Sequence, residues 1–149
     1  MAAVCRVLIT IILLFLFCVN AWSSKQTYVK RPTGYERPKI IHVLKKEFGK
    51  ELKKPMKLKL SVYRIQNKWA YLQGTILDKS GKPMDYSHTV YQEAIDQGYF
   101  DDWFSALLQK TKGEWHVVIY QIGATDIPDL DWPKRYGAPE NIINPKALD

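Results

Sequence analysis

The chain has 149 residues, of which 46% are hydrophobic and 25% are charged, and its formal net charge is +7. This composition is enough for one domain with an ordinary hydrophobic interior. The only cysteines, Cys5 and Cys18, lie in an apolar N-terminal segment, so the rest of the chain offers no disulfide, thiolate nucleophile or cysteine metal ligand.

The first residues have the pattern of a signal peptide. Arg6 precedes an apolar run over residues 7–17, and small residues follow that run. The run is shorter than the roughly 20 residues that a membrane-spanning helix needs. We therefore expect residues 1–23 to be removed, no transmembrane anchor to remain, and the protein to be exported to the periplasm or secreted. Cleavage before Trp22 and before Ser24 both fit the pattern, and an uncleaved anchor is the alternative.

The positive charge is concentrated in the N-terminal third. Residues 25–59 contain twelve Lys or Arg and three Glu, whereas residues 60–149 contain nine basic and twelve acidic residues. Such a region attracts anionic partners through long-range forces that salt weakens. For an exported protein we expect contact with an anionic envelope polymer, lipid headgroups or an acidic protein rather than with nucleic acid. The alternative is a solvated lysine-rich surface that maintains solubility.

Residues 24–37 are polar and predict a flexible leader. A helix is predicted to begin at Pro38 and to end near Gly49 or a few residues later. One side of it is apolar, with Ile40, Ile41, Leu44, Phe48 and Leu52. The other side carries Lys45, Lys46, Lys50 and Lys53. This amphipathic pattern indicates a helix that packs on an apolar surface.

Two antiparallel strands are predicted next, over residues 56–65 and 69–77, joined by a turn at residues 66–68. In the first strand Leu58, Leu60 and Val62 are expected on one face. In the second, Ala70 and Leu72 are expected to face away from Trp69 and Tyr71.

A long connection follows, in which residues 90–97 predict a short helix closed by Gly98. A second hairpin is predicted from residue 100, with its turn at Lys112-Gly113. In its last strand Trp115, Val117 and Ile119 are expected on one face and Val118, Tyr120 and Ile122 on the other. Apolar residues on both faces favour a central or doubly covered strand.

Residues 127–149 have four prolines and no regular period, and predict an irregular C-terminal tail held on the surface by Leu130, Trp132 and Tyr136. Residues 38–126 then form an α+β domain, in which an N-terminal amphipathic helix packs on a four-stranded antiparallel sheet made of two hairpins. This arrangement is similar to the cystatin-like and NTF2-like folds.

Four stretches of the chain occur in a characteristic order: WAYLQG, FDDWFSALL, EWHVVIYQIGATDIP and DWPKRYGAPENI. This ordered set is similar to a family of small exported proteobacterial proteins without an established activity. The resemblance spans residues 38–143. It implies export and the fold described above, and it transfers no site residues.

Several aspartates and one histidine are candidates for catalysis or metal binding. Asp101 and Asp102 are a possible acid and base pair, but adjacent strand residues point to opposite faces, so we interpret them as stabilising the start of a strand. His88 is the histidine best placed to work with them, although a solvent-facing loop histidine is the simpler interpretation. Asp126, Asp129 and Asp131 lack the spacing of a calcium loop, and we expect neither a metal nor a cofactor.

Aromatic residues gather between and into the two hairpins, where pockets commonly form. The resulting candidate binding site consists of Tyr86, His88, Tyr91, Asp101, Asp102 and Trp103. Flat rings beside carboxylates suit a sugar or a peptide. The leading hypothesis is a non-enzymatic exported binding or accessory domain that engages an envelope component or a protein partner. The alternatives are a small enzyme or ligand-binding domain with an NTF2-like pocket, and an inhibitor or immunity protein.

Overall fold

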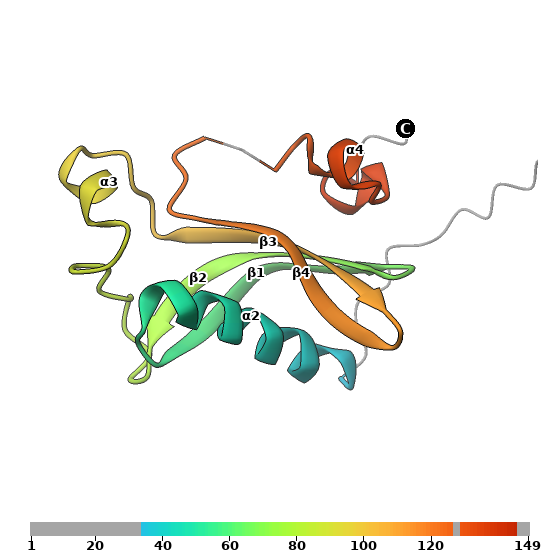
Figure 1. Cartoon of the computed structure of the whole chain (residues 1–149), viewed down its shortest axis with the longest axis horizontal. Coiled ribbons are helices and arrows are strands. Elements are labelled where there is room, and N and C mark those ends of the chain that lie inside the picture. Colours follow the sequence, from blue (N-terminus) through green and yellow to red (C-terminus); the bar gives the residue numbers. More distant parts are fainter. Residues whose placement is uncertain (1–33, 127–128, 146–149) are drawn as a thin grey trace, which may run out of the picture.

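The computed structural model describes residues 34–126 and 129–145 of the chain (Figure 1). The predicted signal peptide, most of the predicted leader, and residues 127–128 and 146–149 of the predicted tail lie outside these residues. Within the described part, no helix is long and apolar enough to span a membrane.

The first described element is the helix α2, which spans Glu36–Leu52 and so begins two residues before the predicted start. Its buried residues recur every four positions, as one stripe of a helix must: Ile40, Leu44, Phe48 and Leu52. The helix ends at Lys53, whose left-handed backbone lets its N–H donate to the carbonyl of Gly49 at 3.1 Å. The predicted amphipathic helix is therefore confirmed.

Four strands form one antiparallel sheet in the order β1-β2-β3-β4, so that each strand lies beside its neighbour in the chain. The strands are β1 (Met56–Gln66), β2 (Trp69–Asp78), β3 (Trp103–Thr111) and β4 (Glu114–Ile122). The turn of the second hairpin has positive φ at both Lys112 and Gly113, as a two-residue hairpin turn requires. Both predicted hairpins are confirmed, and so is the α+β class.

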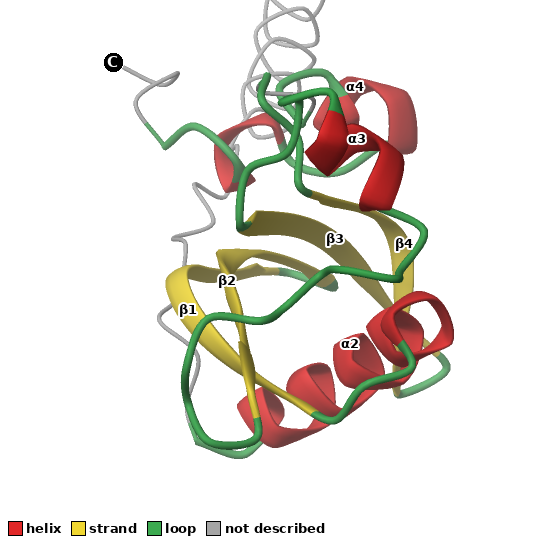
Figure 2. Ribbon diagram, turned by 90° about the vertical axis from the view of Figure 1, so that its left-hand side faces the viewer, coloured by secondary structure: helices red, strands yellow, loops and turns green. Residues whose placement is uncertain are grey.

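The sheet is covered on both faces (Figure 2). The helix α2 packs on one face, which we call the helix-side face. The end of the chain packs on the other, the tail-side face, through the short helix α4 (Trp132–Tyr136) and the 3-10 helix η2 (Glu140–Ile142). The short helix α3 (Gln92–Asp96) lies in the connection between β2 and β3 at one end of the sheet.

The tail is held differently from the prediction. Trp132 is buried and Tyr136 is partly buried against the sheet, as expected. Leu130 is 62% exposed, so its predicted anchoring role was wrong. The buried residue of this turn is its neighbour Asp129, which accepts a hydrogen bond from the hydroxyl of Tyr71. A polar contact therefore takes the place that we assigned to an apolar one.

A β-bulge in β1 changes which residues share a face. Leu60 pairs with Gly74 and Val62 with Gln73, so Ser61 is an extra residue with no partner in the register. Val62 consequently packs on the tail-side face, whereas Leu60 stays on the helix-side face. The predicted common face for these two residues was wrong, because strict alternation does not survive an inserted residue.

A second bulge has the same effect in β4. Leu108 pairs with Val117 and Leu107 with Ile119, which leaves Val118 as the extra residue. The helix-side residues of β4 are Trp115, Val117, Tyr120 and Ile122, and the tail-side residues are Val118 and Ile119. The predicted faces were therefore wrong for the second half of the strand. The strand is covered on both faces, but it lies at the edge of the sheet rather than at its centre.

The bulge in β1 depends on the glycine opposite to it. A Cβ atom on Gly74 would lie 2.2 Å from the backbone carbonyl oxygen of Lys59. We predict that Gly74→Ala lowers the free energy of unfolding by about 1–3 kcal/mol, because backbone must move to relieve the contact. Denaturant unfolding checks this.

The matched control is Gly49→Ala in α2, where a new Cβ atom meets nothing within 4 Å. This variant should raise the free energy of unfolding by about 0.5–1 kcal/mol, because alanine restricts the unfolded chain. Equal effects of the two substitutions would contradict the role given to Gly74.

Candidate functional site

Two of the aromatic residues singled out from the sequence, Tyr86 and Tyr91, form one cluster with Phe100 on the helix-side core. The ring of Tyr86 lies 4.6 Å from that of Phe100 and 6.2 Å from that of Tyr91, between centroids. Tyr86 is only 6% exposed. Burial, followed by the charge of Asp102, raises the pKa of Tyr86 to about 12. This cluster mainly closes the core at the end of the sheet.

The other candidate residues lie around this cluster without forming one site. His88 is exposed in a left-handed turn, and its backbone N–H donates to the side chain of Gln92 at 2.9 Å. Asp101 and Asp102 are also exposed, and no hydrogen bond joins the His88 ring to either within the described residues. Trp103 lines a separate cavity on the tail-side face. The structure therefore brings Tyr86 and Tyr91 together and places the remaining residues elsewhere.

A groove runs between α2 and β4, which we call the α2–β4 groove. Three cavities of about 470, 310 and 400 Å³ follow one another along it and share lining residues. The helix contributes Lys39, His42, Val43, Lys46, Glu47 and Glu51. The strand contributes Glu114, Trp115, His116, Val117 and Tyr120. Of the candidate residues from the sequence, only Tyr91 lines it.

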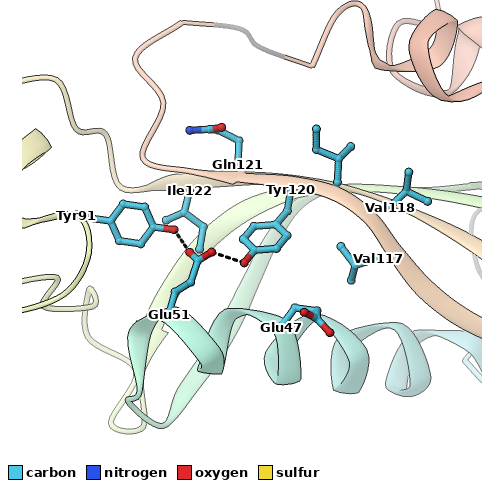
Figure 3. Close-up of a pocket in the computed structure, with 9 residues that line it drawn as sticks. Glu47, Glu51, Tyr91, Val117, Val118, Tyr120, Gln121 and Ile122 are labelled. Carbon is cyan, nitrogen blue, oxygen red and sulfur yellow. Dashed lines mark hydrogen bonds between the residues drawn. The ribbon is translucent and has the colours of Figure 1, made fainter.

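At one end of the groove, Glu51 accepts hydrogen bonds from two phenols (Figure 3). The Tyr120 hydroxyl donates at 2.5 Å, and the Tyr91 hydroxyl donates to the other carboxylate oxygen. Burial first, and then the bond to Glu51, raises the pKa of both phenols. One helical turn earlier, Glu47 points into the same cavity and forms an ion pair with Lys50 at 2.5 Å. This end of the groove is acidic.

At the other end, Glu36 fixes the start of α2 to the sheet. Its carboxylate accepts from Lys110 at 2.8 Å and from the indole N–H of Trp115. The bond from Lys110, followed by that from Trp115, lowers the pKa of Glu36. Lys39, His42 and the buried ring of Trp115 line the cavity there. The helix is therefore joined to β4 at both ends, and the groove lies between these two attachments.

The backbone of β4 faces the open side of the sheet. The N–H of Gly123 donates to the carbonyl of Trp103 at 2.9 Å, which places residue 123 in a hydrogen-bonded pair. Because hydrogen-bonded and non-hydrogen-bonded pairs alternate, Tyr120 and Ile122 turn their N–H and C=O groups away from β3. When the pairs are counted from the hairpin turn, the same alternation directs the N–H and C=O groups of Trp115 and Val117 away from β3. Among residues 34–126 and 129–145, no other segment forms a backbone hydrogen bond with these groups, so they can pair with another strand.

The arrangement suits binding rather than metal chemistry. Within the described residues, no group of three or more His, Cys, Asp or Glu side chains could hold a metal ion. Two of the aspartates considered for calcium are engaged elsewhere: Asp129 with Tyr71, and Asp131 in an ion pair with Arg135. The groove instead offers outward backbone groups, an apolar floor and charges of both signs.

Comparison with models of protein families, with curated proteins and with solved structures gave no match. The assignment of function therefore depends on the geometry of this chain. The residues that our sequence reasoning missed are the glutamates of α2. Their signal was available, because Glu36, Glu47 and Glu51 are the only acids among twelve basic residues in the N-terminal third. Glu36 and Glu51 accept hydrogen bonds from side chains outside α2, and Glu47 forms an ion pair with Lys50 in the next helical turn.

The raised phenol pKa values predict a pH dependence. The phenol pKa of Tyr120 is raised in the folded protein. Just above pH 10, the folded protein therefore keeps the Tyr120 proton, whereas the unfolded chain, with a phenol pKa of about 10, has lost it. The stabilisation is therefore complete below about pH 10 and decreases as the pH rises further. We predict that Tyr120→Phe costs about 1 kcal/mol of unfolding free energy at neutral pH, and that its difference from wild type shrinks above about pH 10.

Urea unfolding at a series of pH values measures this difference. Tyr35→Phe is the control, since Tyr35 is 72% exposed and its ring contact with Lys39 is kept by phenylalanine. A difference between wild type and Tyr120→Phe that stays constant through the alkaline range would argue against the hydrogen bond to Glu51.

Proposed function

We propose that this protein is an exported, non-enzymatic binding domain that engages a protein partner through the α2–β4 groove. An extended segment of the partner adds to the sheet beside β4 and places its side chains in the groove. The observation that carries this proposal is the outward-facing backbone of an edge strand directly beside three connected cavities. Addition of a strand to an exposed edge is a recurrent mode of peptide recognition.

The two edges of the sheet differ in a way that favours β4. The other edge, β1, carries Lys57, Lys59 and Arg64, and lysines on an edge discourage pairing with another chain. Arg64 also donates to the backbone carbonyl of Ile142 at 3.0 Å, which holds the tail near that edge. The helix-side residues of both edge strands are apolar or aromatic, but only those of β4 line the groove. A partner strand is therefore better accommodated at β4.

The charges along the groove define what the segment should carry. Glu47 and Glu51 make one end acidic, whereas the rest of the groove carries the exposed Lys39 and Lys46 together with one carboxylate, Glu114. The apolar floor at Val117 and Trp115 lies between them. We therefore expect an extended segment with a basic side chain toward Glu51, an apolar residue at the centre, and an acidic side chain toward Lys39.

We also propose that the fold is cystatin-like and that the protein is exported. One helix followed by a four-stranded meander supports a cystatin-like arrangement more than an NTF2-like one. The N-terminal apolar run supports export, and the ordered sequence motifs support a place among the small exported proteobacterial proteins that the chain resembles. The enzymatic alternative has weaker support, because its histidine and carboxylates are exposed without a contact between them.

Replacement of one backbone N–H tests strand addition. Val117 turns its N–H outward and lines two of the three cavities. Proline is tolerated on an edge strand when the lost N–H faces solvent. We predict that Val117→Pro keeps the fold but weakens binding of peptides selected from a displayed random library by about tenfold or more.

Val117→Ala is the matched control, because it also removes the branched valine side chain from the groove but keeps the backbone N–H. It should lose only a small part of the affinity, measured by calorimetry on the same peptides. Thermal unfolding confirms that both variants are folded. If folded Val117→Pro binds the selected peptides as tightly as Val117→Ala does, strand addition is not the mode of binding.

The basic face of α2 is expected to speed the encounter with an anionic envelope polymer. Lys46, Lys50 and Lys53 are exposed and Lys45 is half-buried. We predict that changing these four lysines to glutamine slows association with polygalacturonate, a carboxylate-bearing polysaccharide, several-fold at low salt and little at high salt. Stopped-flow kinetics across a salt series measures this effect.

The control changes the same number of exposed lysines outside the N-terminal third: Lys68, Lys79, Lys82 and Lys134. Both variants have the same net charge, so a difference between them reports the location of the charges. Equal slowing by the two sets would show that only the total charge matters.

A further inference from the structure

We propose that the cavity beside Trp103 is a binding site for a neutral sugar ring. It lies on the tail-side face and has a volume of about 280 Å³. Its lining consists of Ser61, Gln73, Gly74 and Trp103. None of these residues lines the α2–β4 groove, which lies between α2 and the edge strand β4. The site is therefore independent of the proposed peptide groove.

The fold places these residues together through the bulge in β1. Trp103 is the first residue of β3 and pairs with Thr75 of β2. Gln73 lies two residues along β2 on the same face, opposite Ser105. The extra residue Ser61 brings a hydroxyl group to the same cavity. The start of β3 lies at the end of the sheet away from α4 (Figure 1). Trp103 is its first residue and is partly buried.

The lining has the chemistry that a sugar ring needs. The face of a partly exposed indole packs against the C–H groups of a pyranose, and the amide and hydroxyl groups around it bond to the sugar hydroxyls. Gln73 donates one N–H to Asp129 at 3.3 Å, which fixes the orientation of its amide. In the described part of the chain, its second N–H and its carbonyl oxygen have no hydrogen-bond partner and can bond to a ligand.

Incompletely paired polar atoms lie behind this lining. Ser105 and Asp129 are both 0% exposed, and the Ser105 hydroxyl and one Asp129 oxygen have no hydrogen-bond partner within the described residues. Both residues are neighbours of Gln73, one across the strand pair and one through its hydrogen bond. Buried polar atoms without partners are costly. Neither residue lines the cavity, so the polar groups that a ligand meets there are the amide of Gln73 and the hydroxyl of Ser61.

The charges nearby favour a neutral ligand. The four lining residues carry no charge. Asp101 and Asp102 are exposed immediately before Trp103 and disfavour an anionic ligand. Lys59 pairs with Thr75 in the register, but it is exposed and does not line the cavity. A nucleotide or an acidic sugar would lack a cationic partner among the lining residues.

Titration with neutral oligosaccharides tests the site. The probes are tetramers of β-1,4-linked glucose, α-1,4-linked glucose and β-1,4-linked N-acetylglucosamine, with a tetramer of galacturonic acid as the charged comparison. Proton–nitrogen NMR follows the indole N–H of each tryptophan, and Trp103→Phe assigns the signal of Trp103. We expect at least one neutral probe to shift this signal and the Gln73 amide, and the charged probe to shift neither.

Three variants separate the site from general effects on folding. Trp103→Ala should weaken binding of the responding probe about tenfold or more, Trp103→Phe by less, and Ser61→Ala by a few-fold. Tyr35→Ala, which removes an exposed aromatic ring elsewhere, should change nothing. Val117→Pro should bind the sugar normally, and Trp103→Ala should bind groove peptides normally. Failure of every neutral probe to shift Trp103, or a response to the charged probe alone, would overturn the proposal.

Discussion

A sheet that is apolar on both faces is the constraint on which this structure depends. In β2 alone, Ala70 and Leu72 face the helix while Trp69 and Tyr71 face the tail. One helix can cover only one of these faces. The last described residues must therefore cover the other, and the hydrogen bond from Tyr71 to Asp129 holds their start against the sheet. The short helices of the tail are thus part of the core and not an appendage to it.

The attachment of α2 at its two ends explains why a groove exists between them. Glu36 and Glu51 reach across to donors on β3, β4 and the α3 connection, so the helix ends are held close to the sheet. Between them the buried stripe of α2 packs into the core, where the ring of Phe48 lies 5.1 Å from those of Phe104 in β3 and Tyr120 in β4. The edge of β4 is left open along this middle section. A stable helix position and an accessible strand edge are therefore two results of the same pair of contacts.

The elements of the fold were predictable because each has a local cause in the sequence. The spacing of Ile40, Leu44 and Phe48 indicates the helix, and Lys112-Gly113 indicates the second hairpin turn. The faces of the strands beyond each bulge were not predictable. An inserted residue such as Ser61 or Val118 looks like any other strand residue until its partner strand is known. The groove was missed for a related reason, since Glu51 meets Tyr91 and Tyr120 only after 40 and 69 residues of separation.

The position of the tail in the chain also bears on how the protein folds. Synthesis proceeds from the N-terminus, so all four strands and α2 emerge before Trp132 and Ile142, which cover the second face. Until then the apolar surface around Trp69, Tyr71 and Leu107 has no cover. Nascent chains with such surfaces associate with one another or with chaperones. The arrival of Trp132, Ala138 and Ile142 therefore ends the period in which this surface is uncovered and prone to aggregation.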